Sequence, residues 1–346
     1  MQRRILVPIA AALLAAWAAP GARADADKRL LNVMTRNMDA GSDLEWFLVL
    51  SDPTTAAIVT FNEVQASNIP LRAGRLADEI LAQQPDLVAL EEATLWEGGP
   101  PAGPPGIVLD QIQLLLQALT ARGLHYSLVA VQTLTTAAVQ TGPASLVRFT
   151  DRNAILARTD LQQSEMSLSN VQQAIYQARF EFPVGNTVVT ELNGWISVDA
   201  KVRGKVVRFV VTHLLSTAAS IPPTVVIQTA QADELIATLA ASGLPVVLAG
   251  DFNSNAEAGP DATPAAAHIL AAGFTDAWRV FNPPGTGFTW PLFLEDFLAG
   301  TPVVPFERID LIFERGLNVT SVGQTGLTPP WGSDHVGVVA TVQIEP

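Results

Sequence analysis

The chain has 346 residues, of which 49% are hydrophobic and 15% are charged, as is typical of a globular protein with a large core. It contains no cysteine, which excludes disulfides, a thiolate metal site and a cysteine nucleophile. The formal net charge of −13 argues against a broad nucleic-acid footprint, although it leaves room for a local basic cleft.

The first 24 residues have the features of a secretory signal peptide. Arg3 and Arg4 precede the apolar stretch Ile5–Pro20, and Ala22-Arg23-Ala24 gives an A-x-A cleavage pattern. An uncleaved membrane anchor is the alternative, but the stretch is short for a membrane span, which needs roughly 20 residues. We therefore predict a signal peptide over residues 1–24, one domain over residues 25–346 without a transmembrane segment, and a secreted or periplasmic location. Cleavage would remove three arginines and no acid, changing the net charge from −13 to −16.

In the N-terminal half, the hydrophobic pattern predicts short strands separated by helices. Residues 39–70 read as an irregular excursion, and the prolines and glycines of Gly98–Gly106 predict a loop without regular structure. Helices are predicted over Leu71–Gln84 and Ile107–Arg122, and strands over Leu30–Asn37, Asp86–Leu90, Tyr126–Val131 and Asn153–Ala157.

The C-terminal half continues the same pattern. We predict helices over Thr224–Ala241 and Thr263–Ala272, and strands over Trp195–Ala200, Val206–Thr212, Pro245–Ala249, Arg308–Phe313, Val319–Gln324 and Val336–Ile344. Many short strands with interspersed helices favour an α+β fold with packed sheets, because a doubly wound parallel sheet would show uniform alternation of strands and helices.

Polar side chains stand at the ends of six of these strands. The octet VVLAGDFN, residues 246–253, ends in Gly, Asp and Asn, which an ordinary turn would also explain. The other residues also have structural explanations when taken singly; the full set is Asn37, Asp39, Glu92, His213, Asp251, Asn253, Asp310, Asp334 and His335. Carboxylate and amide oxygens suit a hard cation such as Mg²⁺, histidine beside aspartate suits a general base, and Asn and His can donate to a phosphoryl oxygen. Together they predict an active site.

The chain resembles the endonuclease/exonuclease/phosphatase superfamily, which includes secreted deoxyribonucleases and neutral sphingomyelinases. The matching stretches are TRNMD (35–39), PDLVALEE (85–92), VVTHL (210–214), LAGDFN (248–253), RIDLIF (308–313) and SDHVGV (333–338). GDFN and SDH are each weak alone, but all six stretches occur in the family's order across nearly the whole mature chain. The resemblance implies a four-layered α/β/β/α sandwich with the site at one end of the paired sheets.

The resemblance also implies roles for the individual residues. Glu92 would be the main ligand of Mg²⁺, or of Mn²⁺ in its place, with Asn37, Asp39 and Asp334 as direct or water-mediated ligands. Asp310 and His335 would form a dyad. Asp251 would orient or deprotonate the attacking water or protonate the leaving group, while Asn253 and His213 would stabilise the phosphoryl oxygens.

Two departures from the family pattern bear on the site. Glu91 stands where the family usually has glutamine, either as a harmless replacement or as an extra negative charge that alters metal affinity. A long insert between Trp290 and Phe306 leaves Trp290 as either a core residue or a substrate contact. Arg148 and Arg152 either contact phosphate or offset nearby acids, and the apolar excursion over residues 44–61 either packs as an extra helix or faces a lipid.

These observations favour a monomeric, Mg²⁺-dependent hydrolase that cleaves phosphodiesters with activated water. The alternatives are a non-specific DNA endonuclease and a catalytically inactive binding protein on the same fold. A zinc hydrolase is disfavoured, because the four histidines form no HExxH motif or other close ligand pair. The mature chain carries only 3 lysines, and two of them lie in the run Lys201–Arg208, so we expect no stable nucleic-acid complex and prefer a lipid or small phosphodiester as substrate.

Overall fold

The computed structural model describes residues 29–42, 44–218, 221–257, 259, 262–294 and 301–345. The predicted signal peptide lies outside these residues. None of the helices in the described segments is long and apolar enough to cross a membrane.

Two large β-sheets carry the fold. The first has eight strands in the order β17 (Asn318–Thr325), β18 (Gly337–Gln343), β1 (Leu30–Asn37), β2 (Leu87–Glu91), β6 (Ser145–Arg158), β3 (Leu95–Gly99) and β4 (Ile107–Asp110), with β5 (Tyr126–Gly142) also paired to β6. The second has six strands in the order β13 (Thr275–Asp276), β16 (Asp310–Arg315), β12 (Val246–Asp251), β11 (Lys205–His213), β10 (Gly194–Val202) and β7 (Met166–Ile175). In each sheet one central pair is parallel: β1 with β2, and β11 with β12.

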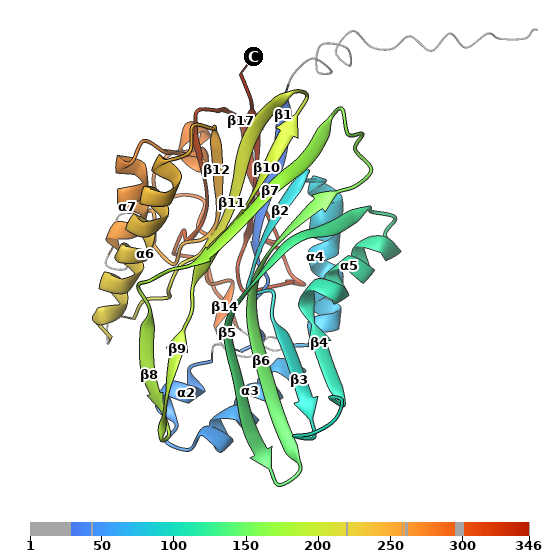
Figure 1. Ribbon diagram of the computed structural model, residues 1–346, viewed down its shortest axis with the longest axis vertical. Helices are drawn as coiled ribbons and strands as arrows, with labels where there is room; N and C mark the ends of the chain where they lie inside the picture. Colours follow the sequence, from blue (N-terminus) through green and yellow to red (C-terminus); the bar gives the residue numbers. More distant parts are fainter. Residues whose placement is uncertain are drawn as a thin grey trace, which may run out of the picture.

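Helices cover the outer face of each sheet (Figure 1). The first sheet packs against α4 (Ile69–Gln83) and α5 (Gln111–Ala121), and the second packs against α6 (Pro223–Ala240) and α7 (Pro264–Ala271). A third apolar core fills the space between the sheets. The fold is therefore the predicted α+β, four-layered α/β/β/α sandwich.

The central strand β2 is apolar from Leu87 to Leu90 because both of its faces are covered. In β2, Leu87 and Ala89 point into the core between the sheets, whereas Val88 and Leu90 point toward α4 and α5. Successive side chains of a strand point to opposite faces, so a strand between two apolar layers has no polar face.

Smaller elements surround one end of the sandwich (Figure 1). They are the helices α2 (Trp46–Val49) and α3 (Pro53–Ala66), and the two-stranded pairs β8 (Phe180–Val184) with β9 (Thr187–Glu191) and β14 (Phe293–Leu294) with β15 (Thr301–Pro302). The short helix α8 (Ala277–Phe281) instead contacts β16 and β17. The strands β7, β8 and β9 were not predicted from the sequence.

Three local predictions were wrong. Residues 39–70 are not irregular, because α2 and α3 lie within them. The predicted loop begins later than Gly98, since β3 continues to Gly99 and pairs with β4 and β6. The predicted helix over Ile107–Arg122 is a strand followed by a helix, because the carboxylate of Asp110 accepts from the backbone N–H groups of Ile112 and Gln113 and so caps α5 at its first turn.

The apolar excursion over residues 44–61 forms two helices, of which α3 packs on the protein. Phe61 on α3 is buried and packs against Trp96. On α2, by contrast, no residue is fully buried, and Leu48 and Val49 are exposed. The indole N–H of Trp46 donates to Glu63 on α3, which fixes α2 in place.

Candidate active site

The strand order brings the predicted site residues to one end of the sandwich. Asn37 ends β1 and is paired in register with Glu91, the last residue of β2. In the other sheet, Asp251 at the end of β12 is paired both with His213 on β11 and with Asp310 on β16. The carboxyl ends of parallel strands lie at the same edge of a sheet. The polar residues of each sheet therefore lie at the same end of the sandwich.

The turn after β12 explains the sequence GDFN. Gly250 has φ = +151°, and a Cβ atom there would lie 1.9 Å from the carbonyl oxygen of Thr212, so only glycine fits. The backbone N–H of Asn253 donates to Asp251 Oδ1 at 2.8 Å, and Asn253 itself has φ = +46°. This turn holds the acid and the amide over the same end of the sheet.

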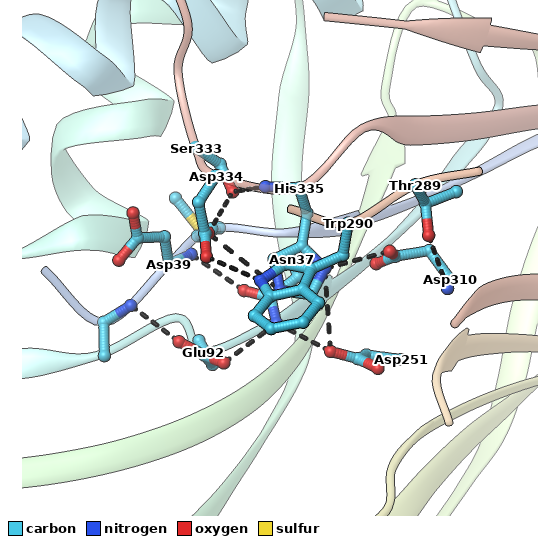
Figure 2. A network of polar contacts seen from close by, with 12 residues as sticks. Asn37, Asp39, Glu92, Asp251, Thr289, Trp290, Asp310, Ser333, Asp334 and His335 are labelled. Carbon is cyan, nitrogen blue, oxygen red and sulfur yellow. Dashed lines mark hydrogen bonds and ion pairs between the residues drawn. The ribbon is translucent and has the colours of Figure 1, made fainter. Parts of the chain in front are cut away.

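Three of the predicted residues form a compact cluster of metal-ligand type. Glu92, Asp251 and His335 each offer one ligand atom, and these atoms lie within 4.8 Å of one another. Asn37 joins the cluster through its side-chain nitrogen, which donates to Glu92 Oε1 and Asp251 Oδ2 at 2.9 Å each (Figure 2). Asp251 and His335, assigned catalytic roles from the sequence, thus lie beside the predicted metal ligand Glu92.

The other two predicted metal-ligating acids lie beside this cluster and are not part of it. Asp39 accepts from the backbone N–H of Gly41 at 2.7 Å, and its Oδ2 lies 3.3 Å from the guanidinium of Arg72. Asp334 accepts from the indole N–H of Trp290 at 3.0 Å, and its Oδ1 lies 3.9 Å from His335 Nε2. Burial raises the pKa of Asp39 well above its usual value, although Arg72 opposes that shift.

His335 and Asp310 lie within hydrogen-bond distance, as expected for a dyad. His335 Nδ1 is 2.9 Å from Asp310 Oδ2, and the backbone N–H of Asp310 donates to Thr289 Oγ1. Burial alone would lower the pKa of His335, but the charges of Asp310 and other nearby acids raise it well above its usual value. The imidazole therefore favours its protonated form.

His213 and Asn253 form the opposite side of the site. His213 Nε2 lies 3.0 Å from the amide nitrogen of Asn253, which also donates to the carbonyl of Leu214. Burial would lower the pKa of His213, but Asp251 and Glu92, with smaller contributions from other acids, raise it. An imidazole and an amide on one side of a carboxylate can supply hydrogen bonds to a phosphoryl oxygen.

Two acids near His213 were missed in the sequence. Burial raises the pKa of Asp151 to about 6 and the pKa of Glu191 to about 7, and in both cases the charge of His213 opposes the shift. Asp151 lies two residues before the predicted strand Asn153–Ala157 and within the longer observed strand β6, so it does not stand at the end of a predicted strand. Glu191 ends β9, a strand that the sequence pattern did not reveal.

Glu91 is not one of the clustered ligand residues and lies between the sheets, near Asp251 and Asp310. It is fully buried, and both of its carboxylate oxygens lie 3.1 Å from the hydroxyl of Thr35. Burial, with the nearby charges of Asp310 and Asp251, raises its pKa well above the usual value, which favours the uncharged acid. This supports the harmless-replacement interpretation, since a protonated carboxyl resembles the neutral glutamine usual at this position.

Trp290 contacts site residues, whereas Arg148 and Arg152 contact other parts of the chain. Trp290 belongs to the site, because its N–H contacts Asp334 and its ring lies 6.3 Å from that of His335. Arg152 is engaged with Asp110 and with the carbonyls of Ala93 and Thr94. Arg148 donates to the carbonyl of Pro101.

The donor set fits a divalent cation. The carboxylates of Glu92 and Asp251 converge in this cluster, and Mg²⁺ and Mn²⁺ take such oxygen ligands together with water. A protonated His335 would lie beside the cation and would not bind it. Two nearby buried polar atoms also lack a hydrogen-bond partner within the described part of the chain, namely Asp310 Oδ1 and His213 Nδ1. Asp39, Glu92 and Asn253 all adopt left-handed backbone conformations, which are uncommon outside glycine and tend to occur at functional sites.

Comparisons with solved structures support the fold. An endonuclease/exonuclease/phosphatase from Beutenbergia cavernae DSM 12333 is 22% identical, covers 92% of this chain and 72% of its own, and has a TM-score of 0.58. The human Nocturnin catalytic domain with bound sulfate anion is 16% identical, with coverage of 91% and 94% and a TM-score of 0.53. D. rerio TDP2 complexed with a single strand DNA product is 17% identical, with coverage of 90% and 98% and a TM-score of 0.52. A search of curated proteins found no match.

The sequence profile of the Endonuclease/Exonuclease/phosphatase family matches residues 64–335, which is most of the chain. The matched region carries every predicted site residue except Asn37 and Asp39, and these two precede it on β1 and the loop that follows. The chain therefore belongs to the endonuclease/exonuclease/phosphatase family of phosphoesterases.

Proposed function

We propose that the protein is an exported, Mg²⁺-dependent phosphodiesterase that acts as a monomer on a lipid or other compact phosphodiester. The observation that carries this proposal is the Glu92–Asp251–His335 cluster, joined by Asn37 and backed by Asp310. A cation held there, with Glu92 as its main ligand, would neutralise charge on the phosphoryl group and the leaving oxygen.

The remaining side chains would have two roles, activation of the attacking water and binding of the phosphoryl oxygens. Asp251, hydrogen-bonded by Asn37, is placed to orient a water molecule and accept its proton. His335, held by Asp310 and carrying a raised pKa, is placed to donate hydrogen bonds to the phosphoryl oxygens. His213 and Asn253 would contact those oxygens from the other side.

The placement of positive charge supports a compact substrate over long DNA. The basic run Lys201–Arg208 covers the turn from β10 into the beginning of β11, whereas His213 at the far end of β11 reaches the site. At roughly 3.3 Å per residue, the beginning and end of this strand are about 26 Å apart. Arg203 and Arg208 are moreover paired with Glu165 and Asp199. Binding to many phosphates of a duplex needs clustered cations that are free to meet them.

A second candidate function is cleavage of nucleic acid. One of the similar structures, D. rerio TDP2, contains a single strand DNA product. A nuclease of this fold could use a local cleft and bridging cations in place of a wide basic surface.

The deciding experiment is a panel of substrates assayed with purified mature protein, with and without Mg²⁺. The panel comprises plasmid DNA, a choline-type lipid phosphodiester, a small aryl phosphodiester and a phosphomonoester, each at low and moderate salt. We expect Mg²⁺-dependent turnover of the lipid or small diester. Efficient nicking of plasmid with no diester turnover would favour the nuclease, and no hydrolysis of any substrate would contradict both candidates.

A further inference from the structure

Two buried glutamines make the same kind of contact on opposite sides of the site. Gln111 on α5 is 2% exposed and Gln228 on α6 is 0% exposed. The side-chain nitrogen of each donates to two backbone carbonyls that belong to two different loops, and each of these loops contains or directly follows a site residue. Because only the nitrogen of a glutamine amide can donate to a carbonyl, these contacts fix the orientation of both amides.

Gln111 joins the loop after β1 to the end of β2. Its nitrogen donates to the carbonyl of Asp39 at 2.8 Å and to the carbonyl of Glu92 at 3.2 Å, and it lies 2.8 Å from Thr94 Oγ1. Asp39 and Glu92 both have left-handed backbone, with φ of 61° and 48°. Asp39 O also accepts from Arg72 at 2.9 Å and Glu92 O from the backbone N–H of Thr94 at 2.7 Å, so what Gln111 adds is the link between these two left-handed residues.

Gln228 makes the corresponding link in the other sheet. Its nitrogen donates to the carbonyl of Asn253 at 2.7 Å and to the carbonyl of Leu215 at 2.8 Å. Leu215 follows His213 by two residues, and Asn253 has φ = +46°. The oxygen of the same amide accepts from Thr263 Oγ1, which holds the side chain against rotation.

We propose that Gln111 and Gln228 are positioning residues that set separate halves of the site. Gln111 holds the backbone of Glu92 and so sets the affinity of the cluster for its cation. Gln228 holds the backbone that carries His213 and Asn253 and so sets the hydrogen bonds made to the phosphoryl group. This inference rests on the proposed function, and its two halves predict different measurable losses.

The test compares Gln111→Met and Gln228→Met, which keep volume but remove the donor. Gln132→Met is the matched control, because Gln132 is also 2% exposed and donates to one carbonyl, that of Ala174 on β7.

Gln111→Met should weaken Mg²⁺ binding, measured by calorimetry without substrate, by about tenfold or more, the scale seen when partners of metal ligands are lost. Its kcat at saturating Mg²⁺ should change little. Gln228→Met should leave the Mg²⁺ Kd unchanged and lower kcat by about tenfold.

Several outcomes would overturn the inference. One is unchanged Mg²⁺ affinity in Gln111→Met, and another is the same loss of kcat in both variants and in the control. If a methionine variant does not fold, amide hydrogen exchange on Gln111→Asn and Gln228→Asn replaces it. Exchange should rise at residues 38–41 and 92–94 in the first and at residues 213–215 and 253–255 in the second, and unchanged exchange would contradict the proposed positioning. Wild-type protein that neither binds Mg²⁺ nor hydrolyses a phosphoester would instead contradict the proposed function, while the exchange experiment would still test the two links.

Discussion

Asn37 and Asp251 connect the two sheets of the sandwich at the site. Asn37 ends β1 of the first sheet, and its side-chain nitrogen donates to Asp251 Oδ2, at the end of β12 of the second sheet, at 2.9 Å. The same nitrogen donates to Glu92 Oε1, so one amide separates two carboxylates that would otherwise face each other. Asn37 therefore holds the carboxylates of Glu92 and Asp251 apart.

Asn37→Ala should lower kcat by roughly tenfold to a hundredfold, since it removes the donor that orients both carboxylates. The control is Asn32→Ala. Asn32 lies near the beginning of β1, and its side-chain amide donates to the carbonyl of Gln83. Both changes remove hydrogen bonds worth about 1 kcal/mol each, so both should lower the free energy of unfolding. Only Asn37→Ala should change steady-state kinetics; equal activity of the two variants would contradict the role of Asn37.

Activity should require a divalent cation. EDTA should abolish turnover, and added Mg²⁺ or Mn²⁺ should restore it, because the Glu92 cluster offers the carboxylate ligands such ions prefer. Glu92→Gln keeps the size of the side chain but removes its charge, so it should raise the Mg²⁺ concentration needed for half-maximal rate. Excess Mg²⁺ should then recover part of the lost activity. Full activity after thorough chelation would exclude the mechanism.

The histidines should divide sharply into essential and dispensable. His335→Ala should lower kcat by at least roughly 10²-fold, the usual scale for loss of acid–base or oxyanion support. Asp251→Asn and His213→Ala should have losses of the same order. His268 provides the control, since it is partly exposed on α7 and pairs with Asp233 away from the site. An essential His268 with a dispensable His335 would show that the site has been assigned to the wrong residues.

The polar strand ends were predictable because they interrupt otherwise apolar runs. Leu30–Asn37 was predicted with the bounds that β1 has, and its last residue lies in the site. The supporting residues were not predictable in this way. Gln111 begins α5 and Gln228 lies within α6, and both helices carry other glutamines, so the sequence does not show that these two face inward toward carbonyls of distant loops. Their contacts span 72 and 25 residues of sequence, so only the packed structure brings the partners together.

The environment of a residue was harder to predict than its position. Glu91 and Glu92 are adjacent and chemically identical, yet Glu91 lies buried between the sheets and Glu92 faces the cluster. Strand alternation predicts that two neighbours point to opposite faces. It does not reveal that Asp310 and Asp251 lie near Glu91 and raise its pKa.

The pH dependence of stability provides a test of the acids beside His213. Burial raises the pKa of Asp151 to about 6 and that of Glu191 to about 7, against roughly 3.9 and 4.3 for unfolded chains. Between about pH 4 and 7 the folded protein therefore binds more protons at these sites than the unfolded chain does. Their contribution to stability is fully present below about pH 4 and is lost as the pH rises through the folded-state values.

The double variant Asp151→Asn/Glu191→Gln removes this dependence while keeping the size of both side chains. In metal-free protein it should match the wild type in urea unfolding near pH 4 and exceed it in free energy of unfolding at pH 7.5. Asp160→Asn is the control of opposite sign, because a hydrogen bond from Arg158 lowers the pKa of Asp160. That variant should lose stability at neutral pH, where the wild-type carboxylate is ionised and paired. A double variant that follows the wild-type curve from pH 4 to 7.5 would show that Asp151 and Glu191 titrate as exposed acids, and that the protein does not hold them in the environment seen beside His213.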